Sequence, residues 1–118
     1  MTDVPARRAF AFEARLELEP GVDPRAPGGA VTVALCGSWA HDGPCRWPHR
    51  NDFDASSSPA RLRTVVIADG ETAAEVAARI ESALRADARW AVANCTTGEI
   101  ATDEQALAAR LMHPKPRE

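Results

Sequence analysis

The chain has 118 residues, 45% of them hydrophobic and 26% charged, which is the composition of a folded globular domain. Its formal net charge of −3 argues against nucleic acid and anionic membranes as partners, because both attract basic surfaces. No segment approaches the roughly 20 apolar residues that cross a membrane, and no signal-peptide core follows Arg7 and Arg8. We therefore expect a cytoplasmic protein. The excess of arginine over lysine is typical of a bacterium with a GC-rich genome.

The length and the pattern of the chain predict a single domain over residues 9–113. Residues 1–8 have no periodic pattern and are expected to be flexible, and residues 114–118 form a polar tail. Residues 10–18 alternate between apolar and polar side chains, which is the pattern of a strand with one buried face. The apolar face of this strand holds Phe10, Phe12, Ala14, Leu16 and Leu18.

Two more strands are predicted before the first helix. Residues 30–40 are predicted to form the first of these. In this segment Val31, Val33 and Leu35 alternate with small side chains, and apolar character on both faces is typical of a central strand. Residues 60–69 contain a short run of β-branched side chains and are also predicted to form a strand.

The hydrophobic period then changes from that of a strand to that of a helix. Thr72 and Glu75 have the spacing of a capping box, which predicts that a helix begins there. A fourth strand follows, ending at Thr97-Gly98 and placing Trp90 in the core, and a short second helix is expected after Thr102. The apolar stripe of the first helix consists of Ala73, Val76, Ala77, Ile80 and Leu84.

The resulting element order, β-β-β-α-β-α, predicts an α+β fold. The third strand, the first helix and the fourth strand form a crossover unit, and the first two strands can join the same sheet. We therefore expect a two-layer sandwich, in which two helices pack on one face of a mixed four-stranded sheet.

Residues 41–60 form a connection of about 20 residues, much longer than the usual 4 to 6, and such loops are often functional. Within and just before this loop, residues 36–49 contain two cysteines and two histidines, the ligand types that zinc prefers. We therefore predict a transition-metal site, with zinc as the expected ion. Its ligands would be His41, Cys45, His49 and, if a bulge reverses its direction, Cys36.

Three other interpretations of this loop stay open. Cys45 has a histidine four residues away on each side and Arg46 beside it, so it could be a reactive thiol. The loop could instead fold back and cover the sheet with its histidines hydrogen-bonded. Base stacking on Trp39, Trp47 and Phe53 is disfavoured, because aspartates outnumber arginines in the loop.

The leading functional hypothesis is a small domain that binds zinc through the Cys/His-rich loop 36–49, in a structural or partner-recognition role. The alternative is a small enzyme in which His41, Cys45 and His49 form a reactive centre with a thiolate or a metal-bound water. The expected partners are another protein or a second copy of the chain, with no membrane and no nucleic acid.

Overall fold

The computed structural model describes residues 7–36 and 47–112. In chain order, the elements in these ranges are β1 (Arg7–Leu18), α1 (Ala26–Cys36), β2 (His49–Asp54), β3 (Ala60–Asp69), α2 (Ala73–Ala86), β4 (Trp90–Gly98), the 3-10 turn η1 (Thr102–Glu104) and α3 (Gln105–Met112).

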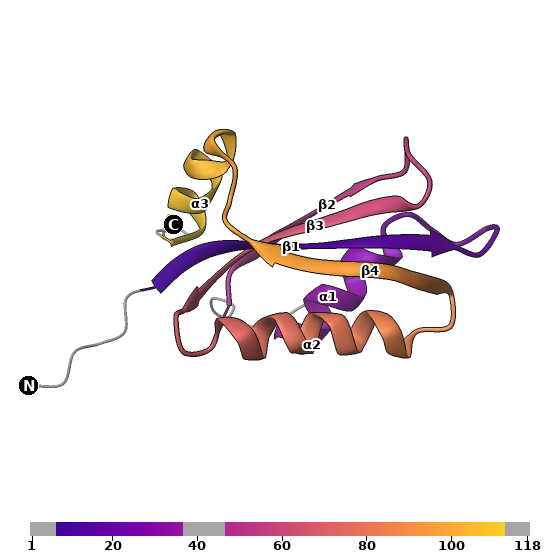
Figure 1. Ribbon diagram of the computed structural model, residues 1–118, viewed down its shortest axis with the longest axis horizontal. Coiled ribbons are helices and arrows are strands. Elements are labelled where there is room, and N and C mark those ends of the chain that lie inside the picture. Colours follow the sequence, from indigo (N-terminus) through magenta and orange to yellow (C-terminus); the bar gives the residue numbers. More distant parts are fainter. Residues whose placement is uncertain (1–6, 37–46, 113–118) are drawn as a thin grey trace, which may run out of the picture.

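The strands form one four-stranded sheet in the order β2-β3-β1-β4, and every neighbouring pair is antiparallel. Helices α1 and α2 cover one face, called the inner face below, and α3 lies on the opposite, outer face (Figure 1). The predicted α+β class with a four-stranded sheet and helices packed against it is confirmed. The helix predicted after Thr72 is α2 on the inner face, whereas the helix predicted after Thr102 is α3 and lies on the outer face (Figure 1). From β1 to β4, the element order and the sheet order are those of the split β-α-β, or ferredoxin-like, topology.

The predicted crossover from β3 through α2 to β4 is present, with β1 inserted between the two strands. Because β1 is antiparallel to both neighbours, β3 and β4 run in the same direction without touching. The sheet therefore contains a parallel crossover and yet has antiparallel ladders throughout, where a mixed sheet was expected.

The segment predicted as the second strand is instead the helix α1. Asp23 stabilises the turn that leads into it: its side-chain Oδ1 accepts the backbone N–H of Arg25 at 2.8 Å, and its carbonyl oxygen accepts the N–H of Ala26 at 2.9 Å. Pro24 lies in the turn that directly precedes α1. The apolar alternation of residues 31–36 therefore arises in a helix that is apolar on every side.

The fourth strand of the sheet, β2, lies inside the predicted loop. Its inner face carries His49, Asn51 and Phe53, and its outer face carries Arg50 and Asp52. Two of the three inward side chains are polar, so no hydrophobic period marks the strand.

The core lies between the inner face of the sheet and the two helices. The apolar face predicted for β1 is buried there, as is the predicted stripe of α2, and Trp90 is 5% exposed. No helix in the described ranges is long and apolar enough to cross a membrane. The largest fully buried core side chains on β1, β3 and α2 are Phe12, Leu16, Leu62, Ile80 and Leu84.

Candidate functional site

The predicted zinc site is contradicted by the surroundings of its described members. No group of three or more histidine, cysteine, aspartate or glutamate side chains in residues 7–36 and 47–112 is placed to hold a metal ion. Cys36 is disulfide-bonded, so it is not a free thiolate ligand. His41 and Cys45 lie outside the described residues. The prediction that the chain binds a metal through loop 36–49 is therefore wrong.

The fourth predicted ligand, His49, is already hydrogen-bonded through both ring nitrogens. Its Nδ1 lies 3.0 Å from the carbonyl oxygen of Trp47, which only accepts, so the Nδ1–H donates. Nε2 is then the acceptor in the neutral ring and takes the hydroxyl proton of Thr32 at 3.0 Å. Burial lowers the pKa of His49 below 6.5, which favours this neutral form.

The same network fixes α1 against the sheet. The side-chain Nδ2 of Asn51 donates to the carbonyl oxygen of Gly28 at 3.0 Å and to the hydroxyl of Thr32 at 3.3 Å, while its Oδ1 accepts from Thr64 at 2.8 Å. A Cβ on Gly28 would stand 3.2 Å from Cβ of Asn51, so this close approach depends on glycine. No buried side-chain nitrogen or oxygen atom among the described residues lacks a partner.

This network has the order hydroxyl, imidazole and carbonyl that an activated nucleophile would need. However, the Asn51 amide donates both of its protons within the network. It therefore has no proton left to stabilise an oxyanion beside Thr32. The cluster is best explained as a structural link between α1, β2 and β3, which matches the interpretation of the loop histidines as simply hydrogen-bonded.

A different place in the fold has the features of a binding site. β1 is paired with β3 from Arg7 to Leu16, whereas its pairing with β4 begins only at Ala11, opposite Gly98. After Gly98 the chain leaves the sheet toward α3. Within the described residues, the stretch from Arg7 to Phe10 therefore has one open backbone edge, and we call the space beside it the β1 notch.

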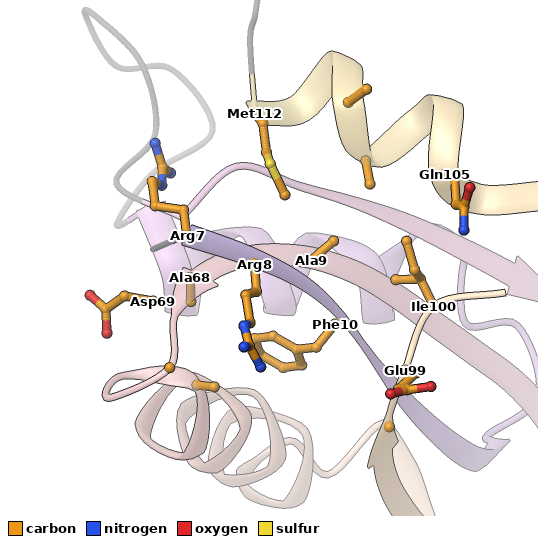
Figure 2. Close-up of a pocket in the computed structure, with 15 residues that line it drawn as sticks. Arg7, Arg8, Ala9, Phe10, Ala68, Asp69, Glu99, Ile100, Gln105 and Met112 are labelled. Carbon is orange, nitrogen blue, oxygen red and sulfur yellow. The ribbon is translucent and has the colours of Figure 1, made fainter. Parts of the chain in front are cut away.

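The β1 notch opens onto a pocket of about 780 Å³ between the N-terminal ends of β1 and α2 and the helix α3 (Figure 2). Strand pleating places Phe10 toward the inner face and Ala9 toward the outer face, so the pocket reaches around both sides of the edge. Its apolar lining includes Ala9, Phe10, Ala68, Ile100, Ala108, Ala109 and Met112.

Charged groups stand at the rim of the notch. Arg7, Arg8 and Glu99 line the pocket and are exposed, and none of them has an ion-pair partner among the described residues. Asp69 also lines it, but its Oδ1 accepts the backbone N–H of Thr72 at 2.8 Å. That bond closes the turn before α2, whereas Thr72 makes no side-chain cap, so the predicted capping box is absent.

A partly buried ion pair holds α3, which forms one wall of the pocket, against the sheet. Arg63, on the outer face of β3, binds Glu104 at the start of α3 through two bonds of 2.6 and 2.8 Å, and it also contacts Glu13 at 3.3 Å. These bonds lower the pKa of Glu104 to about 2. Glu104 also accepts the backbone N–H of Ala101 at 2.7 Å, which fixes the turn into α3.

Two arginines of the outer face, Arg61 and Arg63, are paired with neighbouring carboxylates. Nη1 of Arg61 lies 3.7 Å from Oε1 of Glu13. Arg63 is paired with Glu104 as described above. These contacts leave the face with charges of both signs and no dominant positive potential.

Sequence reasoning missed the β1 notch because its signal is a difference in strand length, not a motif. The sequence of residues 7–10 does not show that β4 ends at Gly98, opposite Ala11, and leaves these residues of β1 without a neighbouring strand on that side. Comparison with known protein families, curated proteins and solved structures finds no match for this chain.

Proposed function

We propose that this domain is a protein-interaction module that binds an extended peptide segment in the β1 notch by strand addition. The observation that supports it is the open backbone edge of Arg7–Phe10 beside a pocket of about 780 Å³. An exposed strand edge is a template for another strand, and peptide-binding domains use such edges for recognition. This proposal narrows the expected protein partner to an extended segment.

The backbone of β1 supplies the affinity in this proposal. In an antiparallel ladder, every second residue directs both its N–H and its C=O to the same side. Within Arg7–Phe10, alternate residues therefore present both groups to the notch, because the others bond to β3. A peptide in line with β4 would satisfy these groups and continue the sheet.

The side chains around the notch define the preferred peptide. The side chains of an extended peptide alternate between the two faces of the sheet. One set would lie on the same face as Phe10 and the other on the side of α3 and Met112, and both of these surfaces are apolar. Arg7 and Arg8 outnumber Glu99 among the unpaired rim charges. We therefore expect an apolar residue at alternate positions, with acidic residues favoured over basic ones between them.

The balanced charge of the surface favours a peptide over a nucleic acid. The chain carries a net charge of −3, and Arg61 and Arg63 on the outer face are paired with carboxylates. Nucleic-acid binding depends on a cluster of unpaired basic groups near the phosphates. A strand in the notch needs only backbone hydrogen bonds and local apolar contacts.

Fluorescence polarisation with labelled, capped hexapeptides tests this proposal. The probes alternate valine with glutamate, with serine or with lysine, and we expect affinity to fall in that order. Two N-methylated versions of the valine–glutamate peptide form a matched pair. In one the methyl groups replace the N–H protons that would bond to β1, and in the other they replace those that would face solvent. One methylated peptide should lose at least ten-fold in affinity, while its partner should bind like the parent.

Two variants locate the binding site on the protein. Ala109→Trp fills the pocket from α3 and should abolish binding, whereas Ala106→Trp changes an exposed alanine of the same helix that does not line it. Arg8→Glu should lower the affinity for the valine–glutamate peptide and leave the serine peptide nearly unchanged. Equal effects of both tryptophans, or equal tolerance of both methylated peptides, would refute strand addition in the notch.

A further inference from the structure

Helix α1 is apolar on a face that the described residues do not cover. None of its 11 residues is charged, and its hydroxyl side chain, Thr32, bonds inward to His49. Val33 points away from the core and is 46% exposed. A helix that is apolar all round is normally buried on every side, so this face has the character of an interface.

Helices α1 and α2 lie side by side on the inner face (Figure 1). The exposed part of α1 forms a shallow groove with α2. Two adjoining hollows of about 460 and 490 Å³ share Ala34 and Ala83 in their linings. Small side chains allow the backbones of two packed helices to approach closely. The centre of this α1/α2 groove is made by Ala30, Val33, Ala34, Ala78, Ala83 and Ala86.

The two ends of the groove carry matched charges. Glu75 and Arg79 line one end, and Asp87 and Arg89 line the other, so each end has one charge of each sign. Glu75, Arg79 and Arg89 have side chains that are 53%, 47% and 54% exposed. Within each end the two charged groups form an ion pair: Nη2 of Arg79 lies 3.7 Å from Oε1 of Glu75, and Nη2 of Arg89 lies 2.7 Å from Oδ2 of Asp87.

We propose that the α1/α2 groove binds the same groove of a second copy of this chain, forming a two-fold symmetric dimer. In this dimer the two-fold axis runs across the groove, so the end with Glu75 and Arg79 meets the partner's other end. Glu75 then faces an arginine and Arg79 faces an aspartate, at both ends of the interface. The uncharged centres pack against each other.

This self-complementarity selects a second copy over other occupants. An anionic lipid surface would favour basic groups around the groove, and a basic or acidic helix would favour one sign. Here each end of the groove carries one acidic and one basic side chain, so in a two-fold symmetric dimer every charged group can face an opposite charge. The dimer does not involve the β1 notch, so it is independent of the proposed peptide binding.

Analytical ultracentrifugation of the full chain, from 1 to 200 µM, measures this association. The wild-type chain is expected to dimerise in this range, and Val33→Asp and Ala78→Glu should each raise the dimer dissociation constant at least ten-fold. Both positions are exposed, and circular dichroism with urea unfolding shows whether the variants fold. Ala106→Glu, on α3 and outside the groove, should leave the dissociation constant unchanged.

Charge reversal then tests the orientation of the two copies. Glu75→Arg and Arg89→Glu should each weaken the homodimer, and the double variant should dimerise at least as tightly as wild type. Mixing the two single variants should give a heterodimer tighter than either homodimer. A wild-type chain that stays monomeric at 200 µM would overturn the proposal, and so would a dimer that tolerates Val33→Asp or a double variant weaker than both singles.

Discussion

His49 shows why residue type alone did not identify the site. The sequence places an imidazole in a loop rich in cysteine and histidine, which is compatible with a metal ligand and with a hydrogen-bonded interior group. His49 is a hydrogen-bonded interior group because of Thr32, a residue 17 positions earlier in the sequence. The helix α1 brings the Thr32 hydroxyl to 3.0 Å from Nε2 of His49. No local spacing encodes that contact, because it arises from packing between elements.

The buried, neutral state of His49 predicts how the stability of the fold depends on pH. Burial holds the pKa of His49 below 6.5 in the folded chain, so the unfolded chain takes up a proton first as the pH falls. The stabilisation is complete above 6.5 and is lost as the pH falls through the lower folded pKa. Urea unfolding at pH 8 and pH 5.5 should therefore show a lower free energy of unfolding at pH 5.5.

Substitution of the histidine separates this effect from other titrations. His49→Gln should cost about 1 to 3 kcal/mol at pH 8, because buried partners lose their hydrogen bonds, and it should reduce the loss between pH 8 and 5.5. His113→Gln, which changes another histidine of the chain, should preserve the wild-type slope. An NMR titration that placed the pKa of His49 above 6.5 would contradict the prediction.

At the scale of elements, sequence reasoning succeeded where a single face of an element is buried. β1 and α2 each present one apolar face to the core, where Phe12, Leu16 and Ile80 lie as predicted, and β3 was recognised from its run of β-branched residues. β2 was missed because its inward side chains are polar, and their partners lie on α1 and β3. α1 was taken for a strand because apolar residues surround it, and this removes the helical period.

The docking of α3 depends on the ion pair between Arg63 and Glu104. Glu104 has a pKa of about 2 in the folded chain against 4.5 for a free glutamate, so its stabilisation is present above 4.5 and lost as the pH falls toward 2. Its side chain is 17% exposed, which limits screening by solvent. Glu104→Gln should therefore lower the free energy of unfolding at pH 7 by about 1 to 3 kcal/mol.

An exposed glutamate on another helix supplies the control for this substitution. Glu81 pairs with Arg85 at 2.8 Å, but both side chains are more than 40% exposed. Glu81→Gln should therefore change the free energy by less than about 0.5 kcal/mol. Urea unfolding at pH 7 and pH 3 measures both variants, and the Glu104 effect should shrink at pH 3. Equal costs for the two variants at pH 7 would show that the pair does not hold α3.

The whole molecule divides into a cohesive body and one separately attached helix. The main hydrophobic cluster draws its side chains from β1, α1, Trp47, β3, α2 and Trp90, and none of them belongs to α3. The helix α3 is attached to the outer face through Ala108 and the Arg63–Glu104 pair. The same helix forms one wall of the β1 notch, so local motion of α3 changes the width of the proposed peptide site.

This division predicts two levels of protection in native-state hydrogen exchange. Amides in the part of β1 after Phe10 that is paired on both sides, and in the central strand β3, should exchange only through global unfolding, because these segments are paired and largely buried. Amides of α3 should exchange through local opening, with an opening free energy well below the free energy of global unfolding. Binding of a valine–glutamate peptide should raise the opening free energy of α3. If α3 exchanged together with β1 and β3 in the free protein, the helix would belong to the same cooperative unit. The notch would then be a rigid site, and peptide binding could not act through the position of α3.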